Sequence, residues 1–234
     1  MGFNILIINP NSSKKVTDNL TKILVEPPET KFHYYTAPDS APKEITNEDT
    51  SILSEKAVLP DIIDHQLIEK YDGFLVCCYS DHPLIYSLGK LTKKPILGIM
   101  QATLLYSLSN ACFRKSFILT SVNEWESILD HAITDFVGIE TGQFPFKKFE
   151  RTKALDVSVL SLSDPQEFKK IYDRVDSIIN GEYKDSHIDC VLLGCAGMAG
   201  LDEKLSQAFP AIQFIDSVKI GVQLLVSLLH FHNN

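Results

Sequence analysis

Short apolar runs alternate with amphipathic segments along the whole chain. Runs rich in β-branched residues that stop at turn residues are typical of buried strands in a parallel sheet. Between these runs, apolar residues recur at spacings of three and four, which predicts helices. The predicted strands are Phe3–Ile8, Lys31–Thr36, Asp72–Cys78, Pro95–Ile99, Ser116–Thr120, Leu155–Leu160, Asp189–Cys195 and Ile212–Ile215.

Helices are expected in the intervening segments. Pro60 is expected to kink or divide the second of them, Asp81 to cap the third, and Gly181 to end the helix that Asp164 caps. The predicted helices run from Ser12 or Ser13 to Val25, then over Glu48–Glu69, Asp81 onward, Gln101–Ala111, Trp125–Val137, Asp164–Asn180, Ala199–Ala208 and Val218–Leu229.

The pattern restarts in the middle of the chain. The segments 72–80 and 189–197 each contain an aspartate, an apolar run and then a cysteine followed by small or polar residues, at an offset of 117 residues. Alternating strands and helices indicate an α/β fold with parallel sheets. We therefore predict two similar Rossmann-like lobes related by a pseudo-two-fold axis, formed by residues 1–98 plus 216–234 and by residues 99–215.

Ligands of such folds bind beyond the carboxyl ends of the strands. Matched strand ends in two lobes would enclose a cleft between them, and we expect the active site there. Asn11 and Asn123 follow corresponding strands, which favours a site role for Asn11, although a turn residue in Asn-Pro-Asn is the alternative.

Composition narrows the partners. The 234 residues carry a formal net charge of −8, which argues against nucleic-acid binding, and a small-molecule substrate is expected. No segment approaches the roughly 20 apolar residues of a membrane helix, so no membrane partner is expected. The first residues lack the features of a secretory signal, which favours a cytoplasmic location.

The five cysteines are then expected to be reduced thiols. None of their spacings is typical of zinc, so no metal site is expected. A single cysteine at a strand end is usually a core residue, and this interpretation is kept for Cys77, Cys112 and Cys190.

Cys78 and Cys195 differ, because they occupy matched positions where a strand gives way to a turn. Helix N-termini there would lower the thiol pKa and offer backbone donors to an anion. Two opposed thiols could remove a proton from one face of a carbon and return one to the other face, with neither metal nor cofactor.

Four motifs carry a family resemblance. They are Ile8-Asn9-Pro10-Asn11-Ser12-Ser13, Cys78-Tyr79-Ser80-Asp81, Leu193-Gly194-Cys195-Ala196-Gly197-Met198 and Ile215-Asp216-Ser217-Val218. With them the chain resembles, from end to end, the Asp/Glu/hydantoin racemase superfamily and its hydantoin and allantoin racemase branch.

The resemblance implies a cofactor-independent racemase, an isomerase in which Cys78 and Cys195 are the paired acid and base. It also makes a homo-oligomer the expected state. The substrate-binding residues that it implies are Asn11, Tyr79, Ser80, Thr120, Ser121, Ala196 and Gly197.

The sequence departs from the branch at two positions. His82 is inserted before Pro83, and Gln101 replaces the glutamate of a common Glu-Ala pair. His82 is either a third acid/base group or a solvent-facing residue of the first helical turn, and the second interpretation is favoured. Asp216 is a helix cap or orients a ligand, and Pro10 is a further candidate site residue.

The leading hypothesis is racemisation of a 5-substituted hydantoin, with allantoin the first natural candidate. An Asp/Glu-type amino-acid racemase, a maleate isomerase and a decarboxylase with one working thiol are alternatives within the enzyme class. A non-catalytic metabolite-binding protein is the alternative from another class.

Overall fold

The computed structural model describes residues 2–162 and 164–232, so residues 1, 233 and 234 of the first predicted lobe and Ser163 of the second lie outside it. The chain divides into two compact units. Unit 1 comprises Met1–Ala102 and Val218–Asn234, and unit 2 comprises Thr103–Ser217. Each unit contains a four-stranded parallel sheet, which confirms the predicted α/β class and the two similar lobes.

The sheet of unit 1 has the order β2-β1-β3-β4. Its strands are β1 (Phe3–Asn9), β2 (Thr30–Thr36), β3 (Gly73–Val76) and β4 (Ile96–Gly98). Ile8 pairs with Val76, and the Cys77 amide extends this pairing by donating to the Ile8 carbonyl at 2.8 Å. The segments that follow β1 and β3 therefore leave the sheet side by side, at its carboxyl edge.

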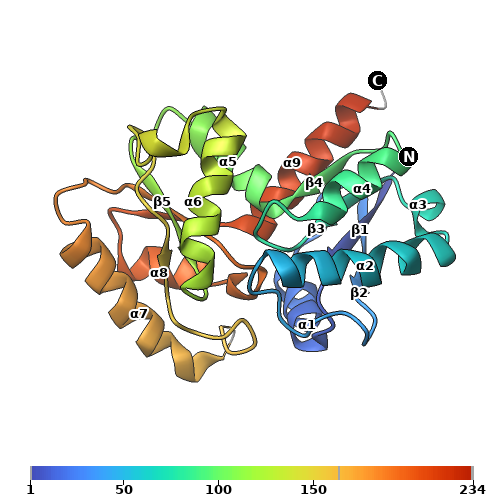
Figure 1. The fold of residues 1–234 in the computed structure, drawn as a ribbon, viewed down its shortest axis with the longest axis horizontal. Helices are drawn as coiled ribbons and strands as arrows, with labels where there is room; N and C mark the ends of the chain where they lie inside the picture. Colours follow the sequence, from blue (N-terminus) through green and yellow to red (C-terminus); the bar gives the residue numbers. More distant parts are fainter. Residues whose placement is uncertain (1, 163, 233–234) are drawn as a thin grey trace. The chain divides into compact units, whose positions relative to one another are not determined.

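Helices cover both faces of this sheet (Figure 1). The helices of unit 1 are α1 (Lys14–Ile23), α2 (Glu48–Asp64), α3 (Leu67–Lys70), α4 (Pro83–Leu91), the start of α5 (Ile99–Ser109) and α9 (Ser217–His232). On one face, Ile8 and Val76 belong to the apolar cluster that also contains Ile62 of α2 and Leu88 of α4. On the other face α9 lies so close that a Cβ on Gly221 would meet Leu75 at 3.0 Å.

The sheet of unit 2 repeats the arrangement, with the order β6-β5-β7-β8. Its strands are β5 (Ser116–Thr120), β6 (Lys153–Ala154), β7 (Cys190–Leu193) and β8 (Gln213–Asp216), and its helices are α6 (Glu124–Val137), α7 (Phe168–Asp176), α8 (Asp202–Ala208) and the rest of α5. β3 and β7 hold the same place in the two sheets, so the repeat seen in the sequence is a repeat of structure.

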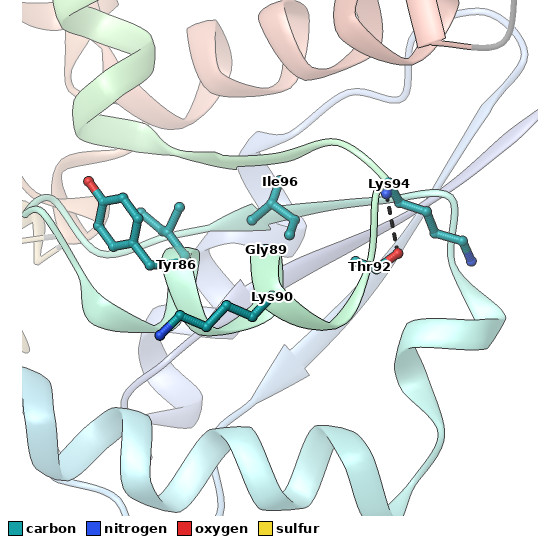
Figure 2. Close-up of a pocket in the computed structure, with 7 residues that line it drawn as sticks. Tyr86, Gly89, Lys90, Thr92, Lys94 and Ile96 are labelled. Atoms are coloured by element: carbon teal, nitrogen blue, oxygen red, sulfur yellow. Dashed lines mark hydrogen bonds between the residues drawn. The ribbon is translucent and has the colours of Figure 1, made fainter.

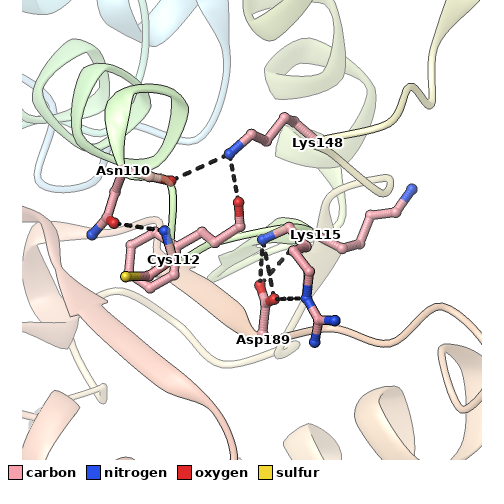
Figure 3. A network of polar contacts seen from close by, with 7 residues as sticks. Asn110, Cys112, Lys115, Lys148 and Asp189 are labelled. Carbon is pink, nitrogen blue, oxygen red and sulfur yellow. Dashed lines mark hydrogen bonds and ion pairs between the residues drawn. The ribbon is translucent and has the colours of Figure 1, made fainter.

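The aspartate that opens each repeat copy has a structural role. The Asp72 carboxylate accepts the Asn4 backbone N–H at 2.7 Å, next to the start of β1. The Asp189 carboxylate accepts the backbone N–H groups of Arg114 and Lys115 at 3.0–3.2 Å, just before β5 (Figure 3). In both units the carboxylate thus holds the start of the neighbouring strand in place through backbone hydrogen bonds.

Cys112 was predicted to be a core residue, but it is exposed. α5 ends at Ser109, and the exposed Cys112 follows in a turn where its backbone N–H donates to the Asn110 side chain at 2.9 Å. Lys148 donates to the main-chain carbonyl groups of Asn110 and Phe113, which holds this turn in place (Figure 3). Asparagine side chains compete for backbone groups in this way, which ends helices early.

Pro60 does not divide the helix, which was one of its two predicted effects. α2 continues through Pro60 to Asp64, held by the buried Val58 and Ile62 on either side. The chain turns instead at Gln66, which adopts the left-handed conformation with φ of 53°.

Two predictions in unit 2 need correction. The segment Leu155–Leu160 is not a strand: β6 ends at Ala154, and the segment continues as a loop in which Leu155 N–H donates to Thr120 O, at the end of β5, at 2.9 Å and Val157 N–H to Ser121 O at 3.1 Å. Gly181 does not end the helix after Asp164, since a π-helical segment, Ser177–Glu182, continues past it. Asp164 does act as a cap, but of the 3-10 turn Pro165–Glu167 that directly follows it.

Candidate active site

The loop between β3 and α4 presents Cys78. Its side chain is partly buried, and Sγ lies 3.4 Å from the Ser80 hydroxyl. The Ser80 backbone N–H donates to the Cys78 carbonyl at 3.1 Å, so the loop folds back on itself. Tyr79 and Ser80 are each 4 % exposed. The neighbouring Cys77 is buried, as predicted for a core thiol.

His82, and not Asp81, caps α4. Pro83 occupies the first helical position, where its missing N–H costs nothing, so the residue directly before it becomes the cap. Nδ1 of His82 accepts the Leu84 backbone N–H at 3.2 Å, and the side chain is fully buried rather than solvent-facing. Burial lowers the pKa of His82 to about 4, so the imidazole is neutral at pH 7.

Asp81 instead joins two side chains. Its Oδ1 accepts from the Tyr86 hydroxyl at 2.6 Å and from Nε2 of Gln101 at 2.8 Å. The bond to Asp81, with some burial, raises the pKa of Tyr86 to about 12. A glutamate at position 101 would face the Asp81 carboxylate with like charge, whereas the Gln101 amide donates to it.

The loop between β1 and α1 presents Asn11, which is 7 % exposed. Its Oδ1 accepts the Ser13 backbone N–H at 3.0 Å. Asn11 is therefore a turn residue, which was the alternative to a role in the site. Neither Ser12 nor Ser13 caps α1 through its side chain: the Ser12 hydroxyl donates to Ala41 O at 2.9 Å, and Ser13 at the cap position makes no capping bond. The Pro10 carbonyl is fixed by the Ser54 hydroxyl at 2.6 Å.

Asn9 is the residue of this loop that sequence reasoning missed. It is fully buried, donates to Ser13 O and to the Thr17 hydroxyl at 3.0 Å each, and accepts the Asn11 backbone N–H at 3.3 Å. Asn9 thereby sets the position of Asn11. The available signal was a polar side chain at the last position of an otherwise apolar strand.

The loop after β7 presents Cys195, which is 9 % exposed. Its Sγ accepts the Gly197 backbone N–H at 3.4 Å, and its carbonyl accepts the Met198 N–H at 3.0 Å, within the short 3-10 turn Ala196–Met198. Both glycines of the motif are needed for close packing. A Cβ on Gly194 would lie 2.9 Å from Leu119 O, and one on Gly197 would lie 2.9 Å from Val159 O.

Thr120 and Ser121 leave β5 beside this loop. Both are buried, and the Thr120 hydroxyl lies 3.5 Å from the Gly194 carbonyl, to which it donates. Asp216, at the end of β8, is 4 % exposed, and its Oδ2 accepts the Gly200 backbone N–H at 2.8 Å. Asp216 therefore secures the chain that follows Cys195.

The candidate residues thus form two sets, one in each unit. Unit 1 gathers Pro10, Asn11, Cys78, Tyr79, Ser80, His82 and Gln101 around the ends of β1, β3 and β4, and unit 2 gathers Thr120, Ser121, Cys195, Ala196, Gly197 and Asp216 around the ends of β5, β7 and β8. Both thiols were expected at the N-terminus of a helix, but neither lies in the first turn of an α-helix. α4 starts at Pro83, and α8 starts only at Asp202. The Ser80 hydroxyl lies beside Sγ of Cys78, and the Gly197 backbone N–H donates to Sγ of Cys195.

A groove of about 460 Å³ lies elsewhere in unit 1 (Figure 2). It is lined by side chains from α4 and the chain that follows it, namely Ile85, Tyr86, Gly89, Lys90, Thr92, Lys94 and Ile96. Lys94 is committed to the main-chain carbonyl groups of Ile68, Glu69 and Tyr71, at 2.7–3.3 Å. None of these lining residues belongs to the candidate sets.

Within residues 2–162 and 164–232, no three His, Cys, Asp or Glu side chains are grouped so as to hold a metal ion. In that same part of the chain, no helix is both long and apolar enough to cross a membrane.

The chain belongs to the Asp/Glu/Hydantoin racemase family, whose model matches residues 5–225. This confirms the family resemblance drawn from the motifs and, at the level of the family, the expected class of racemase-type isomerases.

Individual relatives match over nearly the whole chain. Protein DCG1 of Saccharomyces cerevisiae is 34% identical, over 100% of this chain and 99% of its own length. A hydantoin racemase of Rhizobium meliloti is 24% identical, over 97% of this chain and 88% of its own. The solved structure of an allantoin racemase from Klebsiella pneumoniae superposes with a TM-score of 0.81 at 23% identity, covering 99% of this chain and 89% of that one.

Proposed function

We propose that this protein is a cofactor-independent racemase of a 5-substituted hydantoin, with allantoin the leading candidate. The observation that carries the proposal is the matched pair of thiols. Cys78 and Cys195 follow strands with the same place in two sheets of the same order. Relatives named hydantoin racemase and allantoin racemase support this substrate class.

The proposed reaction moves one proton on each side of one carbon. The thiolate of one cysteine takes the hydrogen from C5, and the electron pair of the broken C–H bond moves toward the adjacent ring carbonyl to give an enolate. The thiol of the other cysteine then gives its proton to the opposite face of C5. The product has inverted configuration, and the two sulfurs have exchanged protonation states. Each sulfur must come within about 3.5–4 Å of that carbon.

The contacts near the sulfurs suit these roles. A backbone N–H donor, such as that of Gly197 at Sγ of Cys195, stabilises a thiolate without itself titrating. The Ser80 hydroxyl beside Sγ of Cys78 can either donate or accept, so it can follow a change between thiol and thiolate. We assign substrate binding to Asn11, Thr120 and Ser121, and to the backbone at Tyr79–Ser80 and Ala196–Gly197.

The arginines favour a hydantoin over a dicarboxylic amino acid. A free dicarboxylate is commonly bound by a guanidinium fork. All three arginines of this chain are in ion pairs within unit 2: Arg114 with Asp189, Arg151 with Asp130 and Arg174 with Glu182, at 3.2, 3.2 and 2.6 Å. A hydantoin ring, with carbonyl and N–H groups, instead suits the hydroxyl, amide and backbone groups of the two sets.

The decisive experiment follows enantiopure allantoin by polarimetry and, in deuterated water, by NMR at C5. We expect loss of optical rotation together with deuterium incorporation at C5, both without added metal or cofactor. Parallel assays with aspartate, glutamate and maleate test the alternative enzymes. Tight binding of allantoin without exchange would establish the non-catalytic alternative and refute the racemase.

Two further expectations belong to this proposal. We propose a homo-oligomer, which light scattering after size-exclusion chromatography would measure directly. We also propose a cytoplasmic location, where reducing conditions keep all five thiols reduced. Imaging of the tagged protein would check it.

A further inference from the structure

One ring nitrogen of His82 is buried without a hydrogen-bond partner among the residues that the structure describes. Nδ1 accepts the Leu84 backbone N–H at 3.2 Å, whereas Nε2 is the atom without a partner. An imidazole nitrogen that accepts a hydrogen bond carries no proton, so in the neutral ring the proton is on Nε2. His82 therefore presents a buried N–H donor.

The charge state of this donor is fixed by its surroundings. Burial lowers the pKa of His82 to about 4, which keeps the ring neutral at physiological pH. The capping bond to the first turn of α4 holds the ring in one orientation. A buried polar N–H without a partner is unfavourable, and such groups in folded proteins usually meet a ligand or an ordered water.

The position of the donor points to the substrate. His82 ends the loop that begins at Cys78, at the carboxyl edge of the unit 1 sheet, where ligands of such sheets bind. Nδ1 accepts the Leu84 backbone N–H of α4, and the two nitrogens of an imidazole point in different directions, so Nε2 is left for a group other than this N–H. α4 has nine residues, and its N-terminal dipole favours negative charge near this loop.

We propose that the Nε2–H of His82 donates a hydrogen bond to a ring carbonyl oxygen of the bound hydantoin, the oxygen on which negative charge develops when C5 loses its proton. This inference rests on the proposed function and adds a substrate-contacting residue to it. The donor belongs to unit 1 alone, because the repeat offset of 117 places Ala199 at the matched position of unit 2. A neutral donor stabilises the enolate oxygen without delivering a proton to it.

Two variants separate the role of His82 as a hydrogen-bond donor from its role as the cap of α4. His82→Asn keeps an acceptor at the position of Nδ1 and removes the donor at the reach of Nε2. His82→Gln keeps an N–H at that reach and weakens the cap. We expect His82→Asn to lose roughly 100-fold in kcat/KM for allantoin, the scale of one oxyanion donor, and His82→Gln to recover at least part of it. Equal kcat/KM in wild type and His82→Asn would overturn the proposal.

A measurement on the unmutated protein keeps the proposal testable if either variant fails to fold. In protein labelled with ¹⁵N-histidine, the Hε2 resonance of His82 reports the donor directly. The probe is 5,5-dimethylhydantoin, which has no hydrogen at C5 and cannot react. We expect the resonance to move downfield as the probe saturates. An unmoved resonance at saturation, or no binding of the probe, would overturn the proposal.

The outcomes also distinguish this inference from the proposed function. Racemisation of allantoin with an unmoved Hε2 resonance would refute only the role of His82. A moved resonance in a protein that neither racemises allantoin nor exchanges its C5 hydrogen would refute only the racemase.

Discussion

The loops that present the two thiols differ more than the strands that support them. β3 and β7 occupy the same place in sheets of the same order, and each is followed by a cysteine at the repeat offset. After Cys78 the contacts come from side chains: the Ser80 hydroxyl lies near the sulfur, and the His82 ring caps α4. Around Cys195 the contacts come from the backbone: the Gly197 N–H donates to the sulfur, and Gly194 and Gly197, on either side of the cysteine, allow close packing.

This difference teaches that the repeat preserves the position of the thiol and not its surroundings. In the proposed reaction the protein acts on two mirror-image substrates, and the two thiols would exchange the tasks of acid and base between the two directions. A hydroxyl and a backbone N–H beside the two sulfurs provide two chemically different environments for these tasks. The predictions below test whether the two units are as distinct in function as they are in structure.

The largest effect is expected from removing either thiol. Cys78→Ser and Cys195→Ser should each lower kcat for racemisation by roughly 1000-fold or more, since a serine hydroxyl is a far weaker acid than a thiol and is not ionised to a base at neutral pH. Each variant keeps one working thiol. We therefore expect residual C5 exchange in deuterated water to favour one enantiomer in Cys78→Ser and the opposite enantiomer in Cys195→Ser.

Chiral chromatography combined with NMR measures this split. Cys77→Ser, next to Cys78 but in the core, is the matched control for the chemical change. Full racemisation by either site variant, or the same enantiomer preference in both, would contradict the assignment of one thiol to each face.

The second prediction concerns stability in acid, and it belongs to unit 1. The pKa of His82 is about 4 when folded and near 6.5 when unfolded, so between these values the unfolded chain binds a proton that the folded protein does not. The contribution is complete above pH 6.5 and is lost as the pH falls toward 4. The loss amounts to about 3 kcal/mol in the free energy of unfolding.

Urea unfolding at a series of pH values measures this contribution as the difference between wild type and His82→Asn. The asparagine keeps a capping acceptor but does not titrate. The carboxylates are the same in both proteins, so the comparison removes most of their effect. Parallel stability curves between pH 4 and 6.5 would contradict the buried neutral imidazole.

A third prediction compares matched positions in the two loops. The repeat offset pairs Ser80 with Gly197. Gly197→Ala places a Cβ 2.9 Å from Val159 O, so the loop must shift, and we expect a cost of about 1–3 kcal/mol in unfolding free energy together with a lower kcat. Ser80→Ala removes one hydroxyl near Cys78 and should cost no more than about 1 kcal/mol.

Urea unfolding and steady-state kinetics on both variants test this ranking. Both variants carry alanine at matched positions, which removes a hydroxyl at Ser80 and adds a Cβ at Gly197. A larger destabilisation by Ser80→Ala than by Gly197→Ala would show that the close packing in unit 2 is not what holds its loop.

Much of the fold could be predicted from the sequence, because burial on both faces of a parallel strand leaves a continuous apolar run. Ser116–Thr120 was predicted to the residue. Leu155–Leu160 was wrongly predicted to be a strand. Several of its apolar side chains are buried although the segment is a loop, because the spacing of apolar residues reports burial and not hydrogen bonding. Cys112 was misplaced because the predicted helix Gln101–Ala111 ends early, at Ser109, and the chain then turns where the Asn110 side chain accepts the Cys112 backbone N–H.

The candidate site was predictable where residues recur and unpredictable where they act through contacts. Cys78 and Cys195 stand out because the repeat pairs them. His82 looked like a solvent-facing residue because nothing in the sequence shows that its ring folds under the start of α4. The role of Asn9 as an anchor for Asn11 likewise depends on Thr17, eight residues further along the chain.

The smallest effects are expected for the thiols outside the two loops. Burial raises the pKa of Cys190 to about 12, whereas Cys112 is exposed. Only thiolates react with iodoacetamide, so we expect rapid labelling of Cys112 in the native protein and labelling of Cys190 only on unfolding. Cys112→Ser should leave kcat/KM within about twofold and stability within about 0.5 kcal/mol, as for an ordinary surface substitution.

Mass spectrometry of the labelled peptides checks the order of labelling. Modification of Cys190 in the folded protein at a rate close to that of Cys112 would mean that unit 2 opens far more readily than the burial of β7, the strand that leads to Cys195, implies.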